Sequence, residues 1–183
     1  MALSKKDEKK VSEKVFGWLS IVVGLLLITV GLLSWKAGEK VVSTVNKALV
    51  EEKIYFPPTG SPGFDPSAFP AAQKYAGLQV NDGPRAKAFA EDYLGVQFKL
   101  LSGGKTLSEV SAQVATNPTN VQLQQLQGAL FQLSTSKSLL LANGYGAWTQ
   151  GTLVSNIGLA ALGGGAVLLL VGGAEFMRYK KSR

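Results

Sequence analysis

One stretch of the chain restricts its fold more than any other: residues 15–35 contain no charged side chain. At about 1.5 Å per residue, this stretch extends about 31 Å as a helix, which matches the thickness of a bilayer core. A buried helix of a soluble protein seldom stays uncharged for so long. A signal peptide has a shorter apolar stretch, of about 7–15 residues, followed by a small-x-small cleavage site. The sequence has no such site nearby, so we expect a transmembrane helix that stays in the protein.

A second uncharged stretch covers residues 138–174. Its first part carries Asn143, Thr149 and Gln150, so we place the second transmembrane helix at residues 151–176. Aromatic side chains that suit the headgroup level of a bilayer flank the two predicted helices. These candidate membrane-interface residues are Trp18, Trp35, Tyr145, Trp148 and Tyr179.

Lysine and arginine are unevenly distributed along the chain. Residues 1–14 carry five, residues 177–183 carry four, and the long segment at residues 36–150 carries ten. Short basic flanks stay in the cytoplasm, whereas long loops are translocated largely regardless of charge. We therefore expect a plasma-membrane protein with two spans, cytoplasmic tails at both ends and an external segment. Because juxtamembrane basic residues attract anionic headgroups, the net charge of +7 needs no nucleic-acid partner.

Glycine recurs every seven residues in both predicted transmembrane helices, which keeps these glycines on one side of each helix. Small residues let helix backbones approach closely in lipid. We expect the glycines to pack the two helices together as a left-handed antiparallel pair, although the Ala161 and Gly165 pair could instead face another protein. The predicted helix-packing residues are Gly17, Gly24, Gly31, Gly158, Gly165 and Gly172, and Gly151 continues the repeat.

The external segment shows helix start and stop signals but no convincing period-two alternation. Asp82, which precedes a Gly-Pro pair, predicts the start of one helix, and Gly103 with Gly104 predicts its end. The apolar side of this helix is predicted at Phe89, Tyr93, Val96 and Leu100. Thr106 and Glu109 have the spacing of a capping box, which predicts another helix start. The predicted fold is therefore an all-α membrane protein, in which an antiparallel two-helix transmembrane hairpin carries a small extracytoplasmic helical domain.

Residues 54–70 form a loop rich in proline and aromatic residues, with five of the seven prolines of the chain. Proline fixes φ and removes a backbone donor, so this segment is not expected to be helical. Four aromatic side chains distinguish it from a solvated linker. They either cover the core of their own domain or dock onto a partner protein or the membrane surface. The candidate partner-binding residues are Tyr55, Phe56, Phe64 and Phe69.

The chain has no histidine and no cysteine, which excludes a histidine base, a thiol nucleophile, a disulfide and a zinc finger. Three patterns resemble active sites without meeting their requirements. The tripeptide Gly-Lys-Thr at residues 104–106 resembles the end of a phosphate-binding loop but lacks the upstream glycine. Ser134 and Lys137 fit S-x-x-K without its companion elements. Glu91 and Asp92 are adjacent, so on a helix their carboxylates point about 100° apart.

The other external acidic residues are scattered without the spacing of metal ligands. The turns at Asp65 and Asp82 leave an oxygen-only calcium site open. We nevertheless predict no catalytic residue, no cofactor and no metal site.

Several short stretches resemble, in their order, a family of two-span envelope proteins. They are residues 51–54 (EEKI), 76–80 (AGLQV), 83–86 (GPRA) and 103–106 (GGKT), with a later helix containing Gly128 and Leu130, all between the two spans. The family is chiefly actinobacterial, has no established activity, and is often labelled as aromatic ring-opening dioxygenase subunits. The resemblance covers most of residues 15–176 except the proline-rich loop. A dioxygenase label does not fit this chain, because non-haem iron oxygenases need histidine ligands.

These features predict a non-enzymatic integral membrane protein. We expect an accessory or scaffold subunit that binds other membrane or envelope proteins through its external domain. Its partners would be the lipid bilayer and either a membrane protein or a second copy of the chain. The alternative is an envelope sensor or a lipid- or small-molecule-binding module, which requires an apolar pocket within residues 36–150.

Overall fold

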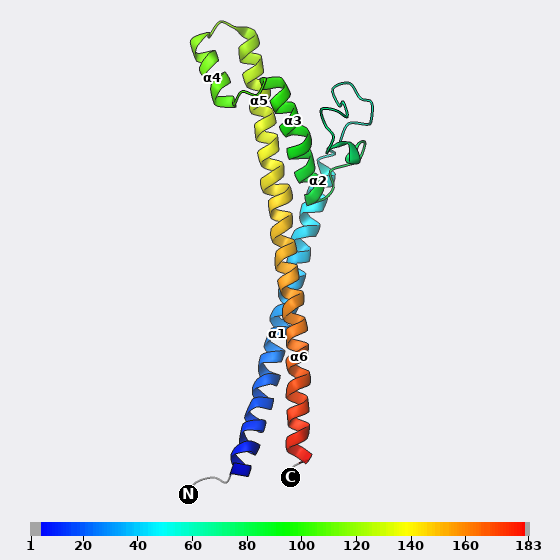
Figure 1. Ribbon diagram of the computed structural model, residues 1–183, viewed down its shortest axis with the longest axis vertical. Helices are drawn as coiled ribbons and strands as arrows, with labels where there is room; N and C mark the ends of the chain where they lie inside the picture. The colour runs from blue at the N-terminus through cyan, green and yellow to red at the C-terminus, as the bar shows by residue number, and fades with distance from the viewer. Residues whose placement is uncertain (1–4, 182–183) are drawn as a thin grey trace. The chain divides into compact units, whose positions relative to one another are not determined.

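The computed structural model describes residues 5–181, with side chains from Val11 onward, so residues 1–4 and 182–183 of the predicted tails lie outside the described part. The described chain is helical, as the sequence predicts (Figure 1). Its elements are α1 (Lys5–Glu51), the 3₁₀-helix η1 (Gln73–Tyr75), α2 (Gly83–Ala88), the π-helix η2 (Phe89–Leu94), α3 (Gly95–Ser102), α4 (Leu107–Thr116), α5 (Val121–Leu139), the π-helix η3 (Leu140–Gly146) and α6 (Ala147–Lys181). Over residues 5–181 the extended pairing is limited to one antiparallel bridge, between Tyr55 and Gln79.

The chain divides into two compact units. The first, here called the two-helix unit, combines Met1–Lys40 with Gly151–Arg183. The second, here called the core unit, is Val41–Gln150.

Two helical stretches, Val11–Glu51 and Val121–Lys181, are long and apolar enough to cross a membrane. In the most apolar window of the first stretch, 22% of the window is buried within the chain, and in that of the second stretch, 17% is buried. The core helix of a soluble protein would be mostly buried, because its apolar side chains pack against other elements. Both stretches therefore leave most of their apolar surface uncovered by the chain itself.

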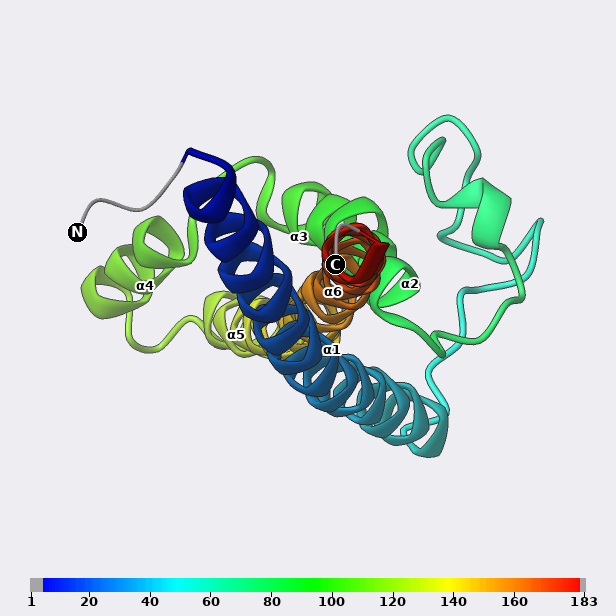
Figure 2. The same cartoon turned by 90° about the horizontal axis from the view of Figure 1, so that it is seen from below.

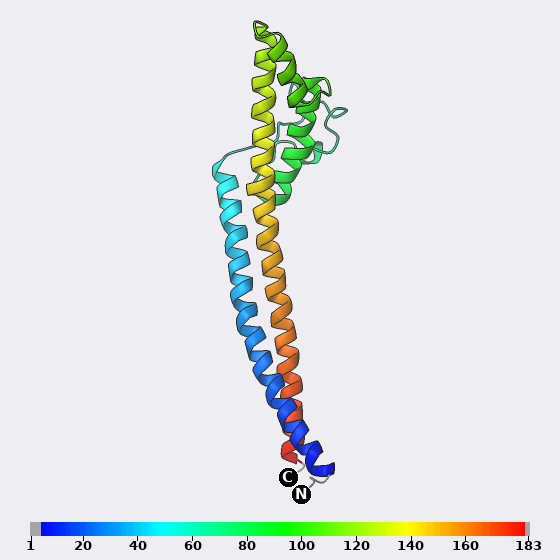
Figure 3. The ribbon, with the colours of Figure 1, turned by 90° about the vertical axis from the view of Figure 1, so that its left-hand side faces the viewer.

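In the two-helix unit, α1 and α6 run antiparallel and side by side (Figures 1 and 3). Along this contact, glycines of one helix face glycines of the other. A Cβ atom built on Gly24 would lie 2.9 Å from the carbonyl oxygen of Gly165, and one built on Gly31 would lie 2.8 Å from that of Gly158. The contact repeats at Gly17 against Gly172 and at Gly38 against Gly151. A side chain at Gly24 or Gly31 would push the backbones apart, because real Cβ atoms do not approach so closely. The close backbone approach of this unit thus depends on missing side chains.

The core unit is built around an aromatic cluster. The ring of Phe56 packs edge-on against Phe89 at 5.0 Å between centroids, and Phe89 lies 4.9 Å from Tyr93. Phe64 and Phe69 contact the same tyrosine ring at 5.7 and 5.5 Å. The loop at residues 54–70 connects α1 to the segment before α2 and folds back on itself (Figure 2). It supplies three of these rings. Its three phenylalanines are therefore core residues of this unit.

The predicted helix caps are confirmed. The Asp82 side chain accepts a hydrogen bond from the backbone N–H of Arg85 at 2.8 Å and caps α2. The Glu109 carboxylate accepts from the Thr106 backbone N–H at 2.7 Å, and the Thr106 hydroxyl accepts from the Glu109 N–H, which completes the capping box of α4. Gly103 ends α3 with φ of 59°, a left-handed conformation that favours glycine.

Candidate functional site

The core unit contains an apolar groove of about 610 Å³. Its floor consists of large side chains from α1 and from the two π-helices η2 and η3, and each of these side chains is less than a tenth exposed. These floor residues are Leu49, Phe89, Leu94 and Leu140. A volume of this size is typical of pockets that hold drug-sized ligands, roughly 300–1,000 Å³.

The rim of the groove carries a few polar groups. Thr44 comes from α1, Glu52 directly follows α1, Ser136 comes from α5, and Asn143 comes from η3, and all four residues are exposed. Glu52 is the charged residue among those that line the groove. An apolar floor with sparse polar groups at its edge favours a ligand that is mainly hydrocarbon with a small polar end.

Both π-helices contribute to this groove. Phe89 and Leu94 are the first and last residues of η2, while Leu140, Asn143 and Gly144 belong to η3. A π-helical turn holds one more residue than an α-helical turn, and such turns occur frequently at functional sites. Residues of both π-helices therefore line the groove.

Glycines bring α2 close to η3 and to the start of α6. A Cβ atom built on Gly144 would lie 2.9 Å from the Cβ of Ala86, and one built on Gly83 would lie 2.5 Å from the Cβ of Trp148. A larger residue at either glycine would separate the two elements. The wall of the groove that Gly144 forms therefore depends on this close packing.

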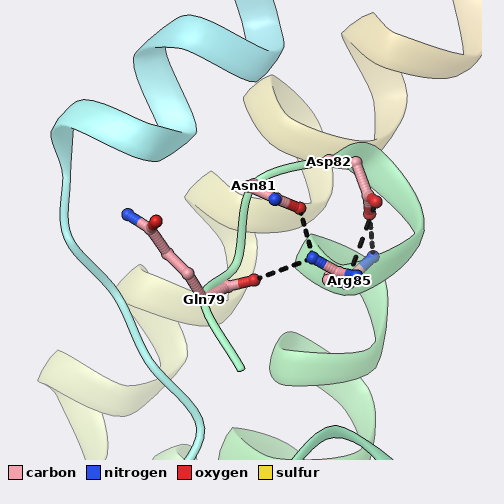
Figure 4. A network of polar contacts seen from close by, with 4 residues as sticks. All are labelled: Gln79, Asn81, Asp82 and Arg85. Carbon is pink, nitrogen blue, oxygen red and sulfur yellow. Dashed lines mark hydrogen bonds and ion pairs between the residues drawn. The ribbon is translucent and has the colours of Figure 1, made fainter. Parts of the chain in front are cut away.

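A polar network fixes the segment that leads from the loop into α2 (Figure 4). The Arg85 guanidinium donates to the side-chain oxygen of Asn81 at 2.6 Å and to the carbonyl of Gln79 at 3.4 Å, and its Nε lies 3.9 Å from the Asp82 carboxylate. The Gln79 side chain in turn donates to the carbonyl of Val50 near the end of α1, at 2.9 Å. The network thereby connects α2 to the part of α1 that forms one wall of the groove.

The proposed partner-binding residues need a correction. Phe56, Phe64 and Phe69 are 1–2% exposed within the core unit, so they cannot form a docking surface there. Their rings are buried because they fill the core that the short helices leave open. Tyr55 is different, since 55% of it is exposed. For the three phenylalanines, the structure therefore supports the first alternative, in which the loop covers the core of its own domain.

The candidate membrane-interface residues lie in both units. In the two-helix unit, Trp18 packs edge-on against Phe176 at 6.2 Å, and the Lys14 amine lies 5.9 Å from the centre of the Tyr179 ring. In the core unit, the Lys87 amine lies 5.0 Å from the centre of the Tyr145 ring, and Trp148 packs against Gly83. Tyr145 and Trp148 thus have contacts with α2.

The acidic residues of the described chain do not gather into a metal site, since no three of them lie close enough to hold an ion over residues 11–181. The Asp65 carboxylate accepts hydrogen bonds from the hydroxyl and the backbone N–H of Ser67, and these bonds lower the pKa of Asp65. The Asp82 carboxylate is used by the cap of α2. Both groups at the two turns are therefore occupied by structural hydrogen bonds.

Comparisons of the chain with protein-family models, with curated proteins and with solved structures found no match. The resemblance to two-span envelope proteins therefore stays a prediction from the sequence.

Proposed function

We propose that this chain is an integral membrane protein that binds a lipid acyl chain, or an apolar molecule of that class, in the groove of its core unit. The observation that carries the proposal is the groove itself, with its apolar floor and its few polar rim groups. The proposal assigns the chain no chemical reaction. It corresponds to the lipid- or small-molecule-binding alternative that the sequence left open.

The occupant is inferred from the apolar stretches that flank the core unit. α1 reaches the groove at Thr44, nine residues after the last residue of the first uncharged stretch, Trp35. A bilayer around residues 15–35 and 151–176 would supply acyl chains at high local concentration. The exposed apolar surface of both stretches supports their place in lipid.

Photo-crosslinking tests the proposal directly. The full chain, reconstituted in lipid nanodiscs with a diazirine-bearing palmitate, should form adducts on peptides that contain residues 44–54 or 136–144. Ala48 lines the groove and is exposed, so Ala48→Phe should fill the groove and remove these adducts. Ala115→Phe, on the exposed side of α4, is the matched control and should retain them. Adducts confined to the two transmembrane stretches in the unmodified chain would contradict the proposal.

A second candidate is the accessory-subunit role, and one observation favours it. The core unit has large apolar side chains that are strongly exposed at the end of α3 and along α5. These residues are Leu100, Leu101, Val121 and Phe131. Crosslinking in native membranes followed by mass spectrometry should recover a membrane protein or a second copy of the chain, with crosslinks close to these residues in the sequence. Recovery of uncrosslinked chain only would count against this role.

A further inference from the structure

Two sequence patterns that meet no catalytic requirement separately come together in one pocket of the core unit. The pocket has a volume of about 310 Å³ and is lined by α3, by residues 104–106 just before α4, and by the C-terminal half of α5. Lys105 and Thr106 come from the Gly-Lys-Thr tripeptide, and Ser134 and Lys137 come from the S-x-x-K pattern. Lys99 adds a third basic side chain. This pocket shares no lining residue with the apolar groove.

The charge of this pocket is positive. Three lysines and no carboxylate line it, and over residues 11–181 none of the three lysines has an ion pair with a carboxylate. The Lys105 amine donates to the neutral side-chain oxygen of Gln113 at 3.2 Å. The Lys137 side chain is half-buried, and its amine lies 3.4 Å from the position of a Cβ atom built on Gly95. Lys99 and Lys105 are exposed and Lys137 is half-buried, so the three amines stay charged, and an anion placed between them would be attracted by all three.

The carboxylate of Glu109, beside the pocket, already accepts hydrogen bonds. Glu109 follows the pocket along the chain, and its carboxylate accepts hydrogen bonds from the Thr106 backbone N–H at 2.7 Å and from the Thr106 hydroxyl at 2.9 Å. Its charge lies close enough to Lys105 for the two to interact, but it does not enter the lining of the pocket. The pocket therefore keeps donors for an external ligand, namely three amines and the Ser134 hydroxyl.

We propose that this pocket binds a phosphate group. Lysine amines bind phosphate oxygens as point charges, and a hydroxyl donor beside them adds a hydrogen bond. The phosphate group comes from either a free phosphate ion or the headgroup of a phospholipid.

Calorimetry on the full chain in a neutral detergent tests this site. The two probes are inorganic phosphate and dihexanoylphosphatidylglycerol, a short-chain lipid with a phosphate headgroup. The double variant Lys105→Gln/Lys137→Gln should weaken binding at least about tenfold, because it removes two charge-assisted hydrogen bonds to the phosphate. Lys47→Gln removes an exposed lysine of the same unit that does not line the pocket, so it should bind as the unmodified chain does.

The outcomes separate the two sources of the phosphate group. Tighter binding of inorganic phosphate supports the free ion, and tighter binding of the short-chain lipid supports the headgroup, provided that the double variant weakens the binding concerned. The proposal is overturned if the unmodified chain binds neither probe saturably, or if the double variant and Lys47→Gln bind equally well. If circular dichroism shows that Lys137→Gln disturbs the helices, the exposed pair Lys99→Gln/Lys105→Gln replaces it, with the same expected loss.

Discussion

At the scale of single residues, the loop phenylalanines determine how stable the core unit is. Phe64 is 1% exposed and contacts both Phe69 and Tyr93. Phe64→Ala should lower the free energy of unfolding of this unit by about 3–5 kcal/mol, because it removes buried apolar area and leaves a cavity. Phe131→Ala is the matched control: this ring is 60% exposed, so the change should stay within about 0.5 kcal/mol. Denaturant unfolding followed by circular dichroism measures both, and equal effects would mean that Phe64 is not a core residue.

The capping box of α4 makes a prediction about pH. Hydrogen bonds from the Thr106 backbone N–H and then from its hydroxyl lower the pKa of Glu109 below its ordinary value of 4.5. A lowered pKa in the folded state means that the box stabilises α4 fully above about pH 4.5, and that this contribution is lost as the pH falls through the lowered pKa. Thr106→Ala should raise the pKa of Glu109 partway back, while Ser108→Ala should not. An NMR titration of the Glu109 carboxyl carbon measures this pKa. An unchanged pKa in Thr106→Ala would contradict a contribution of the Thr106 hydroxyl to it.

At the scale of helices, the sequence predicts the elements well where local chemistry decides them. Asp82, Thr106 with Glu109, and Gly103 mark helix ends because each forms hydrogen bonds or adopts φ values within a few residues of itself. The apolar side of the helix after Asp82 was predicted less well. Leu100, expected on its buried side, is 60% exposed, and Leu94 is buried instead.

The π-helix η2 explains this error. Its wider turn adds one residue and rotates everything that follows, so a 3.6-residue pattern drawn through Phe89 loses register before it reaches Leu100. No local residue type announces a π-helical turn. The apolar groove could be predicted only as a general expectation of a pocket. Much of its floor comes from η2 and η3, which are distant in the chain, and the sequence announces neither π-helix.

The glycine repeat of the two-helix unit predicts a sharp contrast between two faces of α6. A Cβ atom on Gly165 would lie 2.7 Å from the carbonyl oxygen of Gly24, whereas one on Gly163 would meet nothing within 4 Å. Gly165→Leu should therefore push α1 and α6 apart toward the roughly 8–10 Å axis separation of helices that pack through side chains. Gly163→Leu should leave their separation unchanged. Spin labels on cysteines at Leu26 and Val167, both exposed, would report the distance by pulsed EPR. Identical distance distributions in the two variants would rule out the glycine contact.

At the scale of the whole molecule, charge and hydropathy bear on topology more than on chemistry. The chain carries five basic residues before residue 15 and four after residue 176, and the two apolar stretches lie between these groups. The same arrangement explains why a net charge of +7 coexists with two stretches that suit lipid. If both apolar stretches cross a membrane, the predicted topology places residues 36–150 on the opposite side from the two basic flanks.

This topology can be tested because the chain has no cysteine of its own. We expect a cysteine at Thr59, in the core unit, to react with a membrane-impermeant maleimide on intact cells, since long loops are translocated whatever their charge. Cysteines at Ser12 and Lys181 should react after permeabilisation, because the basic flanks around them stay in the cytoplasm. The same three variants labelled in detergent control for intrinsic reactivity. If Ser12→Cys and Lys181→Cys react on intact cells while Thr59→Cys does not, the orientation is inverted. If all three react on intact cells, the two apolar stretches do not span the membrane, and lipid would no longer account for the exposed apolar surface of α1 and α6.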